Sequence, residues 1–294
     1  EDGSIGNEDK QDCYAINYVV ISSEAMRVRM AELNGLEVTY HVMFDGNEVA
    51  TADAPVAHQT TDAPALPAGL NRAFCTYAFY SDEALTNEID AVGTNENVYV
   101  NCTANVPFEY STVEHPRWYF IHSREQGDTN DYYANVDGTT FRMTSQTNVM
   151  DLYAEDAYKW AFIGSPYGVR IVNKAAGKPL ASTAITGTNA SDLTIGVTDD
   201  AAYAYNEFLV YGYGGILGES HGVVNPFTLI LKGSQYGFLI YNGKMKYYNA
   251  GVSINASLGF TGYRSADMMV IDAETYPLTL SPVNGKSYAT LYLP

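Results

Sequence analysis

The sequence is short of basic residues, and this shortage limits the partners that the chain can have. Among its 294 residues, 16 Lys and Arg accompany 34 Asp and Glu, which gives a formal net charge of −18. Nucleic-acid binding needs clustered Lys and Arg to neutralise phosphates, and an anionic membrane surface attracts basic segments. The composition therefore argues against nucleic acid and against an anionic membrane as partners.

Long apolar runs and catalytic signatures are missing as well. No run approaches the roughly 20 apolar residues of a membrane-spanning helix, so we expect no membrane insertion by this chain. The sequence holds no Gly-x-Ser-x-Gly, no His-Glu-x-x-His and no phosphate-binding loop. Its acidic pairs and turns do not match a calcium loop. We therefore predict that the chain is not an enzyme and that it uses no metal and no cofactor.

Cysteine is rare too. The three cysteines, Cys13, Cys75 and Cys102, show no Cys-x-x-Cys and no zinc-type spacing. Cys75 and Cys102 fall in two predicted strands of one small domain, so they could be neighbours. The sequence leaves two alternatives open for them, a disulfide or buried free thiols.

Tyrosine, in contrast, is in excess. The sequence has 25 Tyr against 11 Phe and 2 Trp. Tyrosine joins an apolar ring to a hydrogen-bonding tip, so it suits strands with one wet face, although any single ring can simply pack in its strand. A tyrosine-rich, lysine-poor and acidic chain is typical of extracellular or cell-surface proteins, and we expect that localisation here.

The charge changes sharply near residue 115. Residues 1–115 hold 19 acids and 4 bases, whereas residues 116–294 hold 15 acids and 12 bases. Pro116 disfavours a helix across this point. Together with the loop and strand patterns, this step predicts four parts, namely an acidic tail and N-terminal segment (1–36), a small domain (37–115), a larger domain (116–275) and C-terminal strands or the start of a following module (276–294).

The small domain has a clear strand pattern. Val38–Phe44 alternates between apolar and polar residues, and Glu48–Thr51 returns after Asp45-Gly46, a dipeptide that favours a two-residue hairpin turn. Phe74–Tyr80 and Asn97–Thr103 are the third and fourth predicted strands.

This domain resembles the short repeat of Gram-positive internalins and of many large Bacteroidales surface proteins. The matching residues are the opening hairpin at 38–46, the run Phe79-Tyr80-Ser81-Asp82-Glu83-Ala84-Leu85 and the strand Val98-Tyr99-Val100. Asn101-Cys102-Thr103 stands where the repeat usually ends in an aromatic-rich motif, so the match is a divergent one. The resemblance implies a small β-grasp-like spacer domain.

Three segments of the larger domain open alike, with strands that begin at Trp118, Trp160 and Phe208. Their starts lie 42 and 48 residues apart, and glycine-rich turns separate short strands between them. Such a period is typical of a repeat architecture, and it predicts that the three aromatic residues are equivalent and largely buried in the core. Gly237–Tyr248 adds a predicted hairpin that turns at Asn242-Gly243.

Residues 160–180 carry the pattern Trp-x-Phe-Ile-Gly, Ile-x-Asn and Gly-x-x-Leu, which resembles ricin-B-like β-trefoils. The resemblance covers residues 116–275 and implies a β-trefoil-like domain of three four-stranded repeats, so the predicted fold class is mainly β. The family's Gln-x-Trp is replaced here by Tyr158-Lys159-Trp160, so its sugar specificity cannot be carried over.

The C-terminal residues form two predicted strands, 276–280 and 287–294. The run Lys-Ser-Tyr-Ala-Thr-Leu-Tyr-Leu-Pro at 286–294 is similar to a segment of large Bacteroidales surface proteins that leads into a further module. Since the chain also starts without Met, we expect a mature form or an excised piece of a longer multidomain protein.

Aromatic platforms beside Asp or Asn are typical of glycan-binding sites, because sugars stack on rings and hydrogen-bond to polar neighbours. Strand positions would turn one ring of each tyrosine pair outward. The predicted ligand-binding residues are Asp131, Tyr132, Tyr133, Tyr247, Tyr248 and Asn249.

We therefore predict a monomeric, non-catalytic binding or adhesion module of a bacterial surface protein. Glycan is the leading ligand class, and a host or bacterial surface protein is the other partner considered. Two alternatives remain open. One is a purely structural spacer with no ligand, and the other is an accessory part of a hydrolase whose catalytic domain lies outside this chain.

Overall fold

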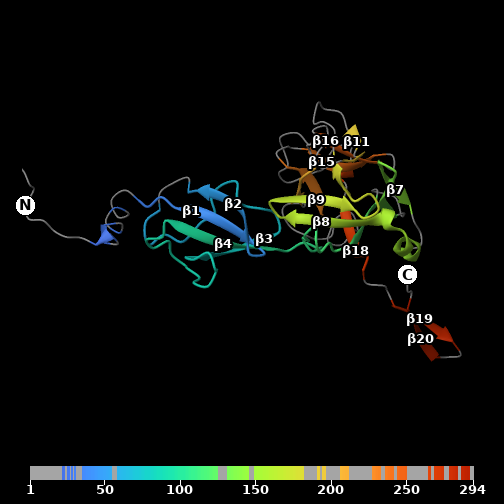
Figure 1. Cartoon of the computed structure of the whole chain (residues 1–294), viewed down its shortest axis with the longest axis horizontal. Helices are drawn as coiled ribbons and strands as arrows, with labels where there is room; N and C mark the ends of the chain where they lie inside the picture. The colour runs from blue at the N-terminus through green and yellow to red at the C-terminus, as the bar shows by residue number, and fades with distance from the viewer. Residues whose placement is uncertain are drawn as a thin grey trace, which may run out of the picture. The chain divides into compact units, whose positions relative to one another are not determined.

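The computed structural model has a mainly β fold, as predicted, with 50% of the residues in strands and 7% in helices (Figure 1). It describes residues 35–54, 58–124, 131–145, 149–181, 206–211, 227–232, 236–241, 244–249, 268–274, 278–283 and 286–291, with a few shorter stretches in 22–30, 191–196 and 264–265. Among these residues, no helix is both long enough and apolar enough to cross a membrane.

The chain divides into two compact units, and the division between them falls within the strands of one small sheet. The first unit consists of Glu1–Val42, Thr51–Leu70 and Ala78–Asn101. The second consists of Met43–Ala50, Asn71–Tyr77 and Cys102–Pro294. The predicted domain limits at residues 36, 115 and 275 stay predictions.

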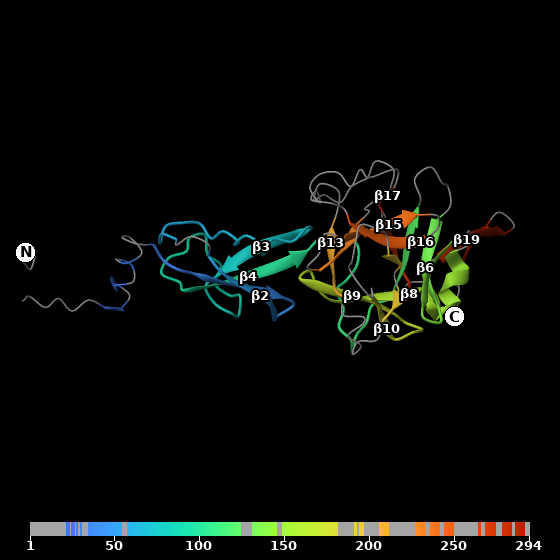
Figure 2. The same cartoon turned by 90° about the horizontal axis from the view of Figure 1, so that it is seen from above.

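The small sheet has the strand order β2-β1-β4-β3. Three of these strands, β2, β3 and β4, are labelled in Figure 2. Its strands confirm the four predicted in this region and are β1 (Thr39–Phe44), β2 (Asn47–Asp53), β3 (Cys75–Tyr80) and β4 (Asn97–Ala104). Asp45 and Gly46 connect β1 to β2 with φ angles of 48° and 76°. Positive φ at both central residues is what a type I′ hairpin turn requires, so the Asp-Gly prediction is confirmed.

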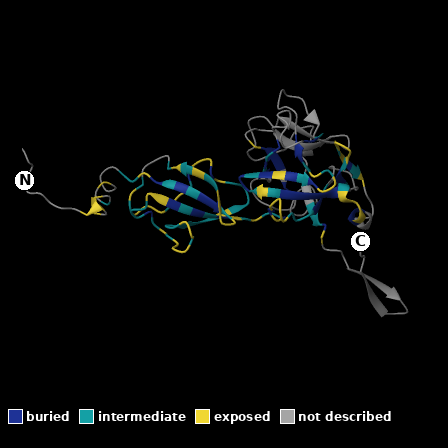
Figure 3. Ribbon diagram, viewed as in Figure 1, coloured by how far each residue is buried: buried dark blue, intermediate teal, exposed yellow. Residues whose placement is uncertain are grey.

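The first unit buries a core of valines and one tyrosine. Val98 and Val100 on β4 are fully buried, whereas Tyr99 between them is less so, as the period of two in a strand requires. Buried and less buried positions alternate along the strands of this sheet (Figure 3). Two residues of β1, Tyr40 and Val42, are also buried, as is Val38 just before the strand. One face of these two central strands therefore forms the core of the unit.

The second unit contains a closed ring of seven strands. Its order is β10-β12-β7-β6-β5-β8-β9, and the pairing of β10 with β9 as well as β12 closes it. The strands are β5 (Tyr119–Arg124), β6 (Asp131–Asp137), β7 (Thr140–Ser145), β8 (Lys159–Ser165), β9 (Gly168–Asn173), β10 (Lys178–Ala181) and β12 (Thr194–Ile195). Two short 3₁₀ helices, η1 (Val149–Ala154) and η2 (Asp156–Tyr158), lead into β8.

Further strands extend this sheet from β9 and from β5. From β9, the order continues through β13 (Phe208–Tyr211), β14 (Thr228–Leu231), β15 (Tyr236–Tyr241), β16 (Lys244–Asn249) and β11 (Ser191–Asp192). Two further strands lie off this order: β17 (Arg264–Ser265) pairs with β15, and β18 (Met268–Asp272) pairs with β5. Tyr241 pairs with Lys244, so the two predicted strands of this hairpin pair with each other, while the predicted turn at Asn242-Gly243 lies outside the described residues. The two predicted C-terminal strands are present as the separate pair β19 (Leu278–Val283) and β20 (Lys286–Leu291).

The second unit packs two groups of buried side chains. The main core is rich in aromatic rings and includes Trp160, Phe162, Phe208 and Phe227. The indole Nε1 of Trp160 donates to the Ala134 carbonyl oxygen at 2.9 Å, so even this fully buried ring has its polar atom satisfied. A second cluster consists of Phe120, Tyr133, Leu152, Tyr153, Tyr158 and Ala273.

A trefoil of three four-stranded repeats is not established by the seven-strand ring and stays a prediction. Trp160 and Phe208 lie in the main core, but Trp118 is half-buried and packs against the second cluster. The expectation that all three are equivalent core aromatics is therefore wrong for Trp118. The reason is register: Tyr119, not Trp118, pairs directly with Trp160 and shares its face, and neighbouring residues of a strand point to opposite faces.

Candidate functional site

The predicted ligand-binding residues lie on two strands that are not paired with each other in the described part of the chain. Strand β6 carries Asp131, Tyr132 and Tyr133, and strand β16 carries Tyr247, Tyr248 and Asn249. The side chains of Asp131 and of the three β16 residues lie outside what the structure describes. Their role in ligand binding stays a prediction.

In the pair Tyr132 and Tyr133, of which one ring was predicted to turn outward, Tyr133 is the ring that turns inward. Tyr133 is 2% exposed and belongs to the second cluster, where its ring stacks on His122 with centroids 5.2 Å apart. Tyr132, on the opposite face of β6, is partly buried against the main core. The sequence pattern assumed one wet face for this strand, whereas packed side chains cover both of its faces.

A different aromatic, Trp118, lies partly exposed among charged side chains. Its backbone just precedes β5 and runs beside the end of β18, because the Ala273 amide donates to the Trp118 carbonyl oxygen at 2.9 Å. One side of the ring packs against the second cluster. We call this region the Trp118 surface, and it consists of Arg117, Trp118, Asp156, Lys174, Asp272 and Glu274.

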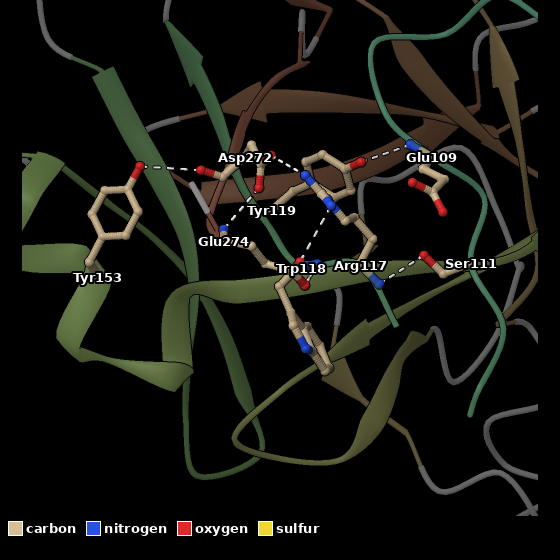
Figure 4. Close-up of polar contacts among 8 residues, drawn as sticks. All are labelled: Glu109, Ser111, Arg117, Trp118, Tyr119, Tyr153, Asp272 and Glu274. Carbon is tan, nitrogen blue, oxygen red and sulfur yellow. Dashed lines mark hydrogen bonds and ion pairs between the residues drawn. The ribbon is translucent and has the colours of Figure 1, made fainter. Parts of the chain in front are cut away.

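Arg117 joins the two carboxylates of this surface (Figure 4). Its guanidinium is hydrogen-bonded to Asp272 and lies 3.5 Å from a Glu274 carboxylate oxygen. The hydrogen bond that Arg117 donates to Asp272 raises the pKa of Arg117 above its usual range. Glu274 also accepts the backbone N–H of Trp118 at 3.1 Å, so the same carboxylate holds both Arg117 and Trp118.

Three further hydrogen bonds fix the backbone around this ion-pair network (Figure 4). The Arg117 amide donates to Ser111 Oγ at 2.9 Å, and the Tyr153 hydroxyl donates to the Asp272 carbonyl oxygen at 3.2 Å. The Glu274 amide donates to Asp272 Oδ1 at 2.8 Å. Trp118 therefore lies on a hydrogen-bonded segment that directly precedes β5.

Lys174 approaches Trp118 from another segment. Its Nζ lies 5.7 Å from the centre of the Trp118 ring and 3.1 Å from Asp156 Oδ1. Lys159 Nζ shares that carboxylate oxygen at 2.8 Å. Hydrogen bonding to Lys159 is the main cause of a pKa of Asp156 below its usual range, and Lys174 adds to it. The turn after β9 thus places an ammonium group over an indole, a favourable cation–π arrangement.

The charges of this region balance. Lys159 is buried beside the Trp118 surface, and with it three bases, Arg117, Lys159 and Lys174, pair with the three acids of the surface, Asp156, Asp272 and Glu274. The side chains of Arg117, Lys174 and the three acids are between 32% and 48% exposed. Water-accessible donors and acceptors therefore surround an apolar ring without a strong field of either sign.

The carboxylates of this region are held in ion pairs. Asp272 and Glu274 both contact the guanidinium of Arg117. In the described residues, no group of three or more His, Cys, Asp or Glu side chains is arranged to hold a metal ion. The region offers hydrogen-bonding groups and an aromatic ring on which a ligand could stack.

Sequence reasoning missed this surface because its parts come from three distant segments. Arg117 and Asp272 lie 155 residues apart and meet because β18 pairs with β5. The one local signal was Arg117-Trp118 directly after Pro116, a charged and an aromatic residue at a strand entry.

Comparison with known proteins identifies no family for this chain. No family model and no curated protein matches it. Among solved structures, it is similar to a GlcNAcα1-4Gal-releasing endo-β-galactosidase from Clostridium perfringens, with 13% identity and a TM-score of 0.35. The match covers 53% of this chain and 32% of that enzyme's chain. A TM-score this low does not establish a shared fold, so nothing about this chain follows from it.

Proposed function

We propose that this chain is a non-catalytic, extracellular binding or adhesion module of a bacterial surface protein, that glycans are its ligand class, and that they bind at the Trp118 surface. The observation that carries the proposal is the partly exposed Trp118 ring flanked by Lys174 and by the Arg117 network. Sugars present an apolar face of C–H groups and a rim of hydroxyls. An indole with adjacent donors and acceptors complements both.

Binding would require one movement. The Lys174 ammonium lies over the ring, and a sugar that stacks there displaces it. The displaced ammonium keeps its partner Asp156 and becomes a donor for a sugar hydroxyl. Because the surrounding charges balance, neutral sugars are the favoured ligands, and their binding should depend little on salt. A shallow stacking site buries little area, so the affinity should be weak.

The experiment is a glycan array with the full chain, followed by calorimetric titration of the strongest ligand. Trp118→Ala should weaken binding about tenfold or more, since buried aromatic anchors dominate binding energies. Trp118→Phe should retain part of the affinity. Arg170→Ala is the matched control, because it removes another part-exposed ion pair of the same unit, that with Glu207, outside the Trp118 surface.

Two results would defeat this proposal. One is an array without any bound glycan, and the other is a ligand whose affinity is the same for the wild-type chain and Trp118→Ala. Turnover of the bound glycan by the purified chain would defeat the non-catalytic part alone.

One observation favours the alternative of a purely structural spacer. Every charged side chain of the Trp118 surface already has a partner within the chain, and the Arg117–Asp272 pair joins β5 to β18. If the surface is structural, Arg117→Ala should lower the melting temperature while no glycan binds. If it is a binding surface, Lys174→Ala should leave stability nearly unchanged and alter the affinity for the sugar.

A further inference from the structure

Two of the cysteines meet at one end of the small sheet, away from the Trp118 surface. Cys75 is the first residue of β3, and Cys102 is near the end of β4, its neighbour in the sheet. The Asn105 amide donates to the Phe74 carbonyl oxygen, which sets the start of β3 beside the end of β4. Both residues belong to the second unit.

Their environments differ in access to solvent. Cys102 continues the alternating buried positions of β4 after Val98 and Val100 and is 3% exposed. Cys75 is partly exposed. A reagent in solution can therefore reach Cys75 and not Cys102.

The two thiols also differ in their acid–base character. A hydrogen bond from Cys102 lowers the pKa of Cys75, and the Tyr77 hydroxyl and the charge of Arg72 lower it further against the effect of burial. The same hydrogen bond and burial raise the pKa of Cys102. Because the thiolate is the reactive form of cysteine, this favours Cys75 as the attacking sulfur.

We propose that Cys75 and Cys102 are a disulfide-forming pair in which Cys75 reacts first and Cys102 resolves the mixed disulfide. Both thiols are free in this structure, and the oxidant would be a small-molecule or protein disulfide. Cys75 attacks one sulfur of that disulfide, breaks its S–S bond and releases one thiolate. The Cys102 thiol then loses its proton to solvent and attacks Cys75 Sγ, releasing the second thiolate. The chain loses two hydrogen atoms as the external disulfide becomes two thiols.

The second step is easier than the resting state of Cys102 suggests. The main cause of its high pKa is its hydrogen bond to Cys75, followed by burial, and this hydrogen bond changes once the Cys75 sulfur is part of a disulfide. A disulfide bond between these neighbouring strands would close a loop of residues 75–102. It should stabilise the folded chain, because it reduces the conformational entropy of the unfolded chain.

The test uses the full chain with Cys13→Ser, so that two cysteines remain, and oxidised glutathione as the probe. We expect a mass lower by two hydrogen atoms, a peptide that joins residues 75 and 102, and a melting temperature higher by roughly 5–10 °C. Adding Cys102→Ser should leave one glutathione on Cys75. Adding Cys75→Ser instead should leave Cys102 unmodified while the chain is folded.

Two outcomes would overturn the proposal. One is a stable glutathione adduct on Cys75 although Cys102 is present, and the other is faster modification of Cys102 than of Cys75. Circular dichroism of each variant before oxidation shows whether its fold is intact. Should a serine variant not fold, the rates of alkylation of the two thiols in the Cys13→Ser chain decide the order of reactivity.

Discussion

The small sheet and the seven-strand ring are both β structures, but they bury different side chains. The core of the first unit is formed mainly by valines on one face of β1 and β4. The main core of the second unit is filled by aromatic rings, with Trp160, Phe162 and Phe208 fully buried. A four-stranded sheet needs a thin layer of branched side chains on one face. A closed ring of strands instead encloses a volume that large aromatic side chains fill. If the two cores are separate, a substitution in one core should destabilise its own unit more than the other.

The largest effect is expected from Trp160→Ala. This change removes a fully buried indole and its hydrogen bond to Ala134, and large-to-small changes of this kind cost about 3–5 kcal/mol. Hydrogen exchange followed by peptide mass spectrometry should show lost protection across β5 to β9 and retained protection in residues 38–42. Equal loss in both places would mean that the two cores unfold as one.

A smaller effect is expected from Val100→Ala in the first unit. Val100 is fully buried, and deleting its two methyl groups should lower the free energy of unfolding by roughly 2 kcal/mol. Chemical denaturation measures the loss, and hydrogen exchange should place it in residues 38–42 and 97–101. Matching deprotection of Phe162 would contradict the separation of the two cores.

Two glycines offer a matched pair, one in the small sheet and one in the seven-strand ring. Gly46 in the β1–β2 turn and Gly177 before β10 have φ angles of 76° and 63°, and a Cβ at either position would meet no atom within 4 Å. Alanine at either site should therefore cost about 1–2 kcal/mol through backbone strain alone. Denaturation of both variants should give similar values, and Asn in place of Ala should recover part of the loss. A much larger cost at one site would show that its turn has a further role.

The smallest effect concerns the pH dependence contributed by Asp156. Its ion pairs with Lys159 and Lys174 lower the pKa of its carboxyl in the folded chain. A lowered pKa stabilises the fold above the unfolded-state value, and this stabilisation is lost as the pH falls through the folded-state value. Because the side chain is 48% exposed, the contribution is small.

Asp156→Asn isolates this contribution. Wild type should be slightly more stable than the variant at neutral pH, and the difference should disappear in acid. Thermal melts over a pH series measure it, with Glu155→Gln as a neighbouring charge control. A difference that grows in acid would have the wrong sign for this account.

Local patterns in the sequence were enough to predict the small sheet and several hairpins. Asp45-Gly46 and Asn242-Gly243 each lie between alternating runs, and both connections join adjacent antiparallel strands. These features depend on residues close in sequence, where turn chemistry and alternation determine the pairing.

The closure of the ring and the Trp118 surface could not be predicted in this way. The pairing of β18 with β5 joins residues about 150 positions apart, and no local pattern encodes it. Tyr133 and Trp118 show the consequence. The sequence pattern left open which ring of the Tyr132–Tyr133 pair turns outward and predicted Trp118 in the core. The structure buries Tyr133 and leaves Trp118 partly exposed, because the face that each residue presents depends on the register and on what covers the strand.

The most direct test of the proposed glycan site uses the chain's two tryptophans. Trp160 is fully buried and Trp118 is partly exposed, so a sugar that stacks on Trp118 should change the tryptophan emission of the wild-type chain. Titration with the strongest array ligand should change the emission of wild type and leave that of Trp118→Phe constant. Equal changes in both chains, or calorimetric binding to wild type without any change in emission, would contradict a binding site at Trp118.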